Sequence, residues 1–164
     1  MKNLILDIDN TLICSMYLEA QYKFDFPDAY YKPDHPEVFS MFDLYRTRKR
    51  SGLEDFLKFC FDNFNVGIWT IAEEKYTQEV LKNIKIKKED LFLLKTRTDC
   101  LYRPDIKTWL KPINTLQDDI IMIDDKPHQI DSKPNDKILP IEPYYGSDDD
   151  DELYKMMKIL EKLI

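Results

Sequence analysis

Residues 2–12 read KNLILDIDNTL, an apolar run that stops at two aspartates, Asp7 and Asp9, with Thr11 two residues later. The pattern predicts a buried strand over Leu4–Ile8 whose end carries the two acids. In open α/β sheets, the carboxyl end of a parallel strand is where the chemistry lies. Two carboxylates this close repel each other unless a cation lies between them. Mg²⁺ is the natural cation, because it takes oxygen ligands and keeps water molecules for a phosphate.

The composition is that of one ordinary globular domain. The chain has 164 residues, 43% of them hydrophobic, which suffices for a buried core and excludes a disordered chain. A net charge of −7 argues against direct nucleic-acid binding, because affinity for a phosphate backbone needs an excess of Lys and Arg. No apolar run reaches membrane-spanning length, and Leu4–Leu6 is too short for a signal peptide. Cys14, Cys60 and Cys100 lack metal-type spacing, so we expect reduced thiols in a reducing compartment.

Strands and helices are expected to alternate along the chain, which predicts a parallel sheet with helices on both faces. The long segment from Cys14 to Arg50 is rich in aromatic residues and interrupted by prolines, which favours short strands and turns. The expected strands are Leu4–Ile8, Ser40–Arg48, Val66–Thr70, Leu91–Leu94, Ile120–Ile123 and Lys137–Ile141, and the expected helices are Leu53–Phe64, Glu73–Ile84, Thr108–Leu116 and one that begins at Ser147.

The acidic run Asp148–Glu152 has two interpretations. It could form a cation site or an interaction tail. The preferred interpretation places it in the first turn of the last helix, where the positive end of the helix dipole favours carboxylates.

Polar residues follow several of the expected strands. Taken singly, each could be a turn former, a capping residue or a surface charge. Their joint occurrence at strand ends is harder to explain by turns, because parallel strands bring their carboxyl ends to one edge of a sheet. The set comprises Asp7, Asp9, Thr70, Lys107, Asp124 and Asp125.

The chain resembles the haloacid-dehalogenase-like phosphatases, and within them the family of small carboxy-terminal-domain (CTD) phosphatases. The segment DIDNT at 7–11 matches the first motif of that family, Asp-x-Asp-x-Thr, and DDKP at 124–127 resembles its acidic fourth motif. The stretches WT at 69–70 and RTDC at 97–100 resemble the segments that lead into the second motif and the motif lysine. The resemblance implies an α/β fold with a three-layer Rossmann-like core, a central parallel sheet and a small β-type insert at about 15–48. It covers 1–164 as one catalytic domain.

The resemblance also implies the roles of the acids. Asp7 would be the nucleophile that forms an aspartyl-phosphate, and Asp9 would act as general acid and then as general base. Mg²⁺ would be bound by Asp7, the backbone carbonyl of Asp9 and Asp124, with Asp125 acting through a water molecule. Many relatives have Asp-Asn where this chain has Asp124-Asp125. The difference changes the local charge, but the expected way in which these residues bind the metal stays the same.

The remaining predicted site residues contact the phosphate or the substrate. Thr70 would hold a phosphoryl oxygen, and Lys107 would offset charge and hold Asp7, with Lys111 as the alternative lysine. Arg97 would grip the substrate. The basic run Arg46–Arg50 is either an electropositive rim or a strand edge protected by charge, and Arg50 is its best candidate for substrate binding.

The leading functional hypothesis is a Mg²⁺-dependent phosphatase of phosphoserine or phosphothreonine in proteins, including peptides like the RNA polymerase II CTD. The aromatic residues of the insert could form a pocket for a proline beside the phosphoserine, or only a hydrophobic mini-core. The alternatives are a phosphatase of a nucleotide, nucleic-acid end or small metabolite, and, ranked lower, a receiver-like or phosphopeptide-binding module. The expected partner is a phosphorylated protein, with neither nucleic acid nor membrane. We expect a monomer, with a dimer as the alternative, in the cytoplasm or nucleus and of viral origin.

Overall fold

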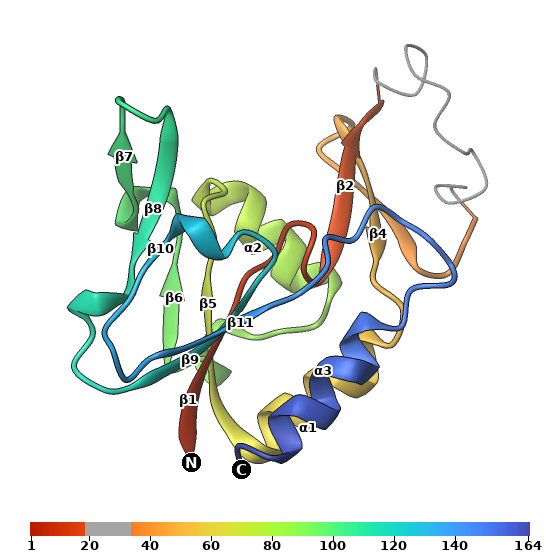
Figure 1. Ribbon diagram of the computed structural model, residues 1–164. Helices are drawn as coiled ribbons and strands as arrows, with labels where there is room; N and C mark the ends of the chain where they lie inside the picture. Colours follow the sequence, from red (N-terminus) through yellow and green to blue (C-terminus); the bar gives the residue numbers. More distant parts are fainter. Residues whose placement is uncertain (19–33) are drawn as a thin grey trace.

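The computed structural model describes residues 1–18 and 34–164, and its centre is a five-stranded parallel sheet in the order β11-β9-β1-β5-β6 (Figure 1). β1 is the middle strand, and its Leu6 pairs in register with Ile68 of β5 and with Ile123 of β9. The carboxyl ends of these three strands therefore meet at one edge of the sheet. The strands of this sheet are β1 (Lys2–Leu6), β5 (Phe64–Trp69), β6 (Leu93–Lys95), β9 (Ile120–Asp124) and β11 (Lys137–Pro140).

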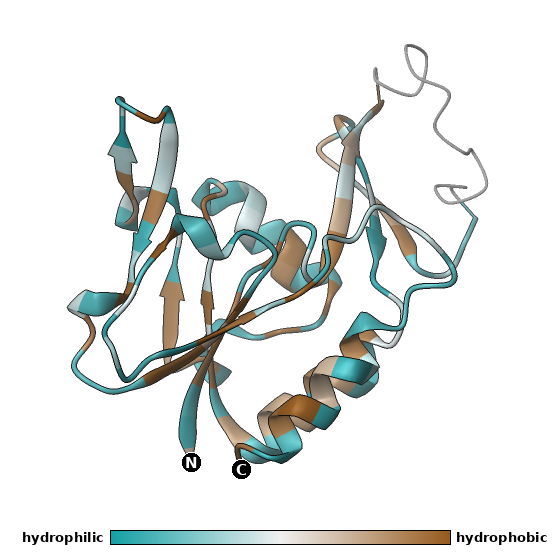
Figure 2. Cartoon of the chain, in the orientation of Figure 1, coloured by the Kyte–Doolittle hydropathy of each residue, from teal (hydrophilic) through white to brown (hydrophobic). Residues whose placement is uncertain are grey.

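Both faces of this sheet are buried, as the nearly continuous apolar sequence of its inner strands requires. Successive side chains of β1 point to opposite faces, so Leu4 and Leu6 join the core beneath the helices while Ile5 joins a second core with Trp69 and Met122. Figure 2 shows hydrophobic colour gathered on the central strands and mixed colour on the helices at the surface.

The α-helices of the described residues share the core on one face of the sheet. Helix α1 lies beside α3, and both present apolar side chains inward, such as Phe56 and Leu160 (Figure 1). The prediction of helices on both faces is corrected here, because the second core is covered by a 3-10 turn and a small sheet in the order β10-β8-β7. The elements are α1 (Leu53–Asn63), α2 (Glu74–Asn83), α3 (Glu152–Glu161), β7 (Leu101–Arg103), β8 (Thr108–Pro112), β10 (Ile130–Asp131) and the 3-10 turns Lys88–Asp90, Arg97–Asp99, Ile113–Thr115 and Pro127–Gln129.

The predicted β-type insert is present as a three-stranded antiparallel sheet in the order β2-β4-β3. Its strands are β2 (Ile13–Tyr17), β3 (Val38–Met41) and β4 (Tyr45–Lys49). A single strand over Ser40–Arg48 was wrong, since the chain reverses after Met41 with positive φ angles at Phe42 (55°) and Asp43 (50°). The aromatic residues between 22 and 31 lie outside the described residues.

Two other predictions of helices need correction. Thr108–Leu116 forms β8 and a 3-10 turn, because the segment pairs with β7 on one side and β10 on the other, and these tertiary hydrogen bonds outweigh its weak helical pattern. The last helix begins at Glu152 and not at Ser147, which leaves Asp148–Asp150 before the helix. Within the described residues, no helix has the length and apolar character needed to cross a membrane.

Candidate active site

The carboxyl edge of the central sheet collects the acids that the sequence separates. Asp7 follows β1 directly, and Asp124 is the last residue of β9, its immediate neighbour. Thr70 follows β5 on the other side of β1. Asp7, Thr70 and Asp124 are all nearly inaccessible to solvent, and together they line a small hollow of about 40 Å³ at this edge.

The predicted lysine is present, at a different position. The Nζ of Lys111, a buried residue of β8, donates to Asp7 Oδ1 and to Asp124 Oδ2 at 2.6 Å each. Lys107 is exposed and lies in the turn between β7 and β8, with a φ of 50°. The structure therefore replaces Lys107 with Lys111, the alternative considered from the sequence. The physical reason is that the hairpin carries Lys107 to its tip, whereas β8 returns Lys111 to the edge of the central sheet.

The acids at this edge have the donor set of a hard-cation site. Carboxylate oxygens of Asp7, Asp124 and Asp125 lie within 4.8 Å of one another, and Thr11 Oγ1 lies 3.1 Å from Asp7 Oδ2 and 3.3 Å from Asp125 Oδ1. Among the described residues, Lys111 is the one cation in ion-pair contact with this group. Three carboxylates against one ammonium leave negative charge uncompensated. Because Mg²⁺ prefers carboxylate oxygens, these residues fit that ion.

Burial makes the shortage of positive charge more severe. It raises the pKa of Asp7 to about 6, against the opposing effect of Lys111, and it also raises the pKa values of Asp124 and Asp125. Burial alone would lower the pKa of Lys111, but Asp7 and Asp124 raise it above its ordinary value, so this lysine stays charged. The arrangement is an anionic, poorly hydrated site with one permanent cation.

Asp9 lies in a different environment from Asp7, although one residue separates them. Its carboxylate makes no ion pair within the described part of the chain and accepts a hydrogen bond of 2.6 Å from the hydroxyl of Tyr76 on α2. Burial raises the pKa of Asp9, and the hydrogen bond from Tyr76 opposes that effect. Tyr76 falls in the expected helix Glu73–Ile84, and its place on the inward side of that helix gave no signal of a role at the site.

The insert and the β7–β8 hairpin rise on the two sides of this edge of the sheet (Figure 1). An open cleft begins at Asp9, with the insert on one side and, on the other, the loop after β5, the start of α2 and Arg97. Its volume is about 430 Å³, and the insert contributes Tyr17 and Tyr45, whose ring centroids are 4.9 Å apart. Arg97, the arginine expected to grip the substrate, lines this cleft. Its Nε donates to the carbonyl of Ile71 at 2.9 Å, and its guanidinium carbon lies 5.8 Å from the centre of the Trp109 ring.

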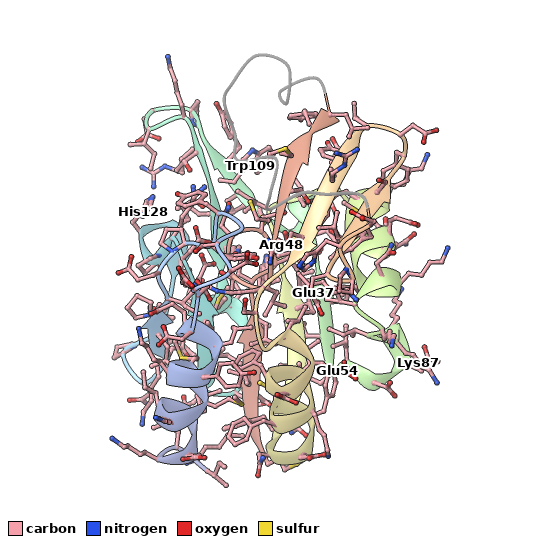
Figure 3. All side chains as sticks on the ribbon, turned by 90° about the vertical axis from the view of Figure 1, so that its right-hand side faces the viewer. Glu37, Arg48, Glu54, Lys87, Trp109 and His128 are labelled. Carbon is pink, nitrogen blue, oxygen red and sulfur yellow. The ribbon has the colours of Figure 1, made fainter. Side chains whose placement is uncertain are left out.

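Arg50 is not at this cleft, so the structure corrects its predicted role. It is completely buried, and it donates to both carboxylate oxygens of Asp150 at 2.8 Å. Arg48, labelled in Figure 3, is also buried. It pairs with Asp148. Arg48 and Arg50 therefore contribute to neither an electropositive rim nor a charged strand edge, since the acidic run neutralises both and β4 is the middle strand of its sheet. For Asp148 and Asp150, this pairing replaces helix capping as the main role, whereas Glu152 lies in the first turn of α3 as predicted.

Comparisons with known proteins agree with this architecture. The family model of the NLI interacting factor-like phosphatases matches residues 2–164. Putative CTD phosphatase-like protein 355R of Invertebrate iridescent virus 6 is 37% identical over 92 residues, which are 54% of this chain and 48% of that protein. The protein of the same name from Invertebrate iridescent virus 3 is 27% identical over 98% of this chain and 95% of its own length. CTD small phosphatase-like protein 2 of Dictyostelium discoideum is 29% identical over 98% of this chain and 27% of its own length.

Solved structures show the same fold. The structure of Fcp1, described as an essential RNA polymerase II CTD phosphatase, has a TM-score of 0.64 at 20% identity and covers 99% of this chain. A variant of the fission yeast Fcp1 bound to beryllium fluoride has a TM-score of 0.63 at 19% identity, also over 99% of this chain. The chain spans 49% and 50% of these two proteins, respectively.

Fold, site and sequence now point to one group. Because the family match extends over residues 2–164, the chain belongs to the NLI interacting factor-like phosphatases, CTD-phosphatase-like enzymes with the haloacid-dehalogenase fold.

Proposed function

We propose that this chain is a Mg²⁺-dependent phosphatase that removes phosphate from serine or threonine residues of proteins through an aspartyl-phosphate. The observation that carries the proposal is that Asp7 and Asp9 lie in two different environments. Lys111 holds Asp7 within the acidic group at 2.6 Å, whereas Asp9 turns toward the open cleft. A nucleophile and a proton donor require these two environments, because the first must stay ionised and in place while the second meets the leaving group.

The reaction then has two steps. In the first, a carboxylate oxygen of Asp7 forms a bond to phosphorus, the bond from phosphorus to the substrate oxygen breaks, and Asp9 gives its proton to that oxygen. In the second, Asp9 takes a proton from a water molecule as the water oxygen bonds to phosphorus, and the bond between phosphorus and Asp7 breaks. Covalent catalysis is valuable here because phosphate monoesters are among the slowest esters to hydrolyse unaided.

The other residues of the hollow compensate charge and hold the phosphoryl group. Asp7, Asp124 and the carbonyl of Asp9 would hold Mg²⁺, with Asp125 acting through water. The ion, when bound, would offset the combined negative charge of the carboxylates and the phosphate. Thr70 Oγ1 accepts the backbone N–H of Ala72 at 3.1 Å, so its own proton can be given to a phosphoryl oxygen. Lys111 would stabilise charge on the transferring group.

An open cleft favours a macromolecular substrate over a metabolite that must be enclosed. Tyr17 and Tyr45 offer apolar surface beside Asp9, and Arg97, whose guanidinium pairs with Glu73 at 3.1 Å, brings a cation to the same cleft. A phosphopeptide with a proline next to the phosphoserine fits this combination, and relatives named for the RNA polymerase II CTD support it. A monomeric state and a cytoplasmic or nuclear location stay predictions.

The test is hydrolysis of an aryl phosphate with Mg²⁺ and with EDTA, by the wild type and by Asp7→Asn. We expect turnover that needs the metal and is lost in the variant, while Lys107→Met, altered at an exposed turn, serves as the matched control and keeps full activity. Turnover that survives both EDTA and Asp7→Asn would contradict the mechanism. Phosphopeptides with and without the proline should then be compared with nucleotides and sugar phosphates. Equal rates for all would remove the substrate assignment.

A further inference from the structure

A chain of hydroxyl groups connects the insert to the carboxylate of Asp9. Tyr76 Oη lies 2.6 Å from Asp9 Oδ1 and 2.7 Å from Ser15 Oγ on β2. Ser15 Oγ in turn lies 2.7 Å from Thr47 Oγ1 on β4, and these two residues are direct partners in the antiparallel register of β2 and β4. A series of hydrogen bonds therefore links three separate elements, β4, β2 and α2, to one oxygen of one carboxylate.

The number of hydroxyl protons in this series determines which group donates each hydrogen bond. A phenol hydroxyl can donate one hydrogen bond, and an ionised carboxylate can only accept. Tyr76 therefore donates its hydrogen bond to Asp9 Oδ1. Tyr76 then accepts from Ser15, whose oxygen is left to accept from Thr47. Every hydroxyl in the series is oriented by the next one, and Thr47, the most distant, is completely buried. Because Thr47 is buried at the far end of the series, the orientation of all the hydroxyls is rigid.

We propose that Tyr76 is a positioning residue that holds Asp9 by Oδ1 and so leaves Oδ2 as the oxygen that exchanges a proton with the substrate. The inference rests on the proposed function, since it assigns the orientation of the same general acid. An aspartate side chain turns easily about its last torsion angle, and a misplacement of about 1 Å can cost on the order of a hundredfold in rate. The insert thus supports the proton transfer as well as lining the cleft.

Two simpler roles for Tyr76 make different predictions. As a substrate contact, it would strengthen binding of a peptide regardless of the leaving group. As a packing residue, it would act through its ring, which lies 5.2 Å from the ring of Tyr45 in an edge-on arrangement. Tyr76→Phe keeps the ring and removes only the hydroxyl, so it separates the packing role from the positioning role.

The experiment measures kcat/KM of Tyr76→Phe over a series of aryl phosphates that runs from nitrophenols to unactivated phenols, and with a phosphoserine peptide. This ratio reports the steps up to departure of the leaving group, in which only a poor leaving group needs a proton. We expect kcat/KM to fall about tenfold for the poorest leaving groups, as part of the total that general acid catalysis contributes, and to stay unchanged for nitrophenols. Ser15→Ala should change the series in the same direction by a smaller factor.

Tyr144→Phe is the matched control, because it removes a phenol hydroxyl that donates to the carbonyl of Lys49 at 3.2 Å, away from the cleft. It should leave the dependence on the leaving group unaltered. A uniform loss across the series with Tyr76→Phe, or a loss confined to the peptide, would overturn the inference. Thermal melting of each variant shows that folding is intact.

Failure of the inference is distinguishable from failure of the proposed function. If the wild type hydrolyses no phosphate monoester, the proposed function fails, and the orientation of Asp9 is then read from crystal structures of the wild type and Tyr76→Phe. We expect one orientation of the carboxylate in the wild type and more than one in the variant. An identical single orientation in both would refute the positioning role without any activity measurement.

Discussion

Asp150→Asn is the most informative substitution for stability, because it separates a buried ion pair from helix capping. Arg50 has no exposed surface, and Asp150 accepts from both its Nε and its Nη2 at 2.8 Å. The same guanidinium donates to the carbonyls of Thr11 at 3.0 Å and Glu142 at 2.6 Å. It therefore joins the loop after β1 to the chain that precedes α3. Asparagine would leave this buried cation short of its counter-charge.

The expected magnitude follows from that burial. Removing one partner of a buried ion pair costs roughly 3–5 kcal/mol, because the other charge stays in a poorly hydrated site. We expect about 3 kcal/mol for Asp150→Asn, since asparagine keeps one accepting oxygen and the Asp150 side chain is 11% exposed. For a chain of this size, that loss lowers Tm by roughly 6–12 °C. Interaction with a helix dipole alone would contribute only about 0.3–1 kcal/mol.

The assay is urea unfolding followed by circular dichroism and tryptophan fluorescence, with Asp149→Asn as the matched control. Asp149 is exposed, is adjacent in sequence, and makes no ion pair within residues 1–18 and 34–164. We expect the control to change the free energy of unfolding by less than about 0.5 kcal/mol, as surface substitutions usually do. Equal losses in the two variants would refute the ion-pair explanation and restore capping by the whole acidic run.

Two further predictions concern side chains whose environment the structure sets. Lys111→Met should lower kcat on the order of 10²–10³-fold, because it removes the cation between two buried carboxylates. Lys107→Met should leave kcat unchanged. A larger loss of kcat with Lys107→Met than with Lys111→Met would contradict the assignment of Lys111 to the site. Burial raises the pKa of the Cys60 and Cys100 thiols, and Cys14 is buried too. A disulfide reagent at pH 8 should therefore label the three thiols only after unfolding. Rapid labelling of the folded protein would disprove this.

The sequence predicted that the strand-end acids would meet at one edge of the sheet, because that information is local. An apolar run that stops at Asp7 and another that stops at Asp124 define two buried strands and their polar ends. Once these strands are parallel neighbours, their ends must meet. No fact about the rest of the chain was needed for this part.

The lysine and the arginine could not be placed in the same way. Spacing counts residues along the chain, but the β7–β8 hairpin sends Lys107 outward and brings Lys111 back, which depends on strand pairing across the second face of the sheet. Charge likewise suggested an exposed Arg50. Its burial depends on Asp150, which is a hundred residues away in the sequence and comes close only through folding.

The amino-acid sequence by itself determined the parallel core, the strand-end acids and the family to which the chain belongs. All three can be predicted from short apolar runs and the motif residues next to them. Only the tertiary structure decided which lysine neutralises Asp7, that Asp148 and Asp150 pair with buried arginines, and that Tyr76 donates a hydrogen bond to Asp9. The physical reason is that each of these interactions joins side chains from distant segments. Hydrogen bonds and ion pairs of this kind exist only after the strands and helices have packed.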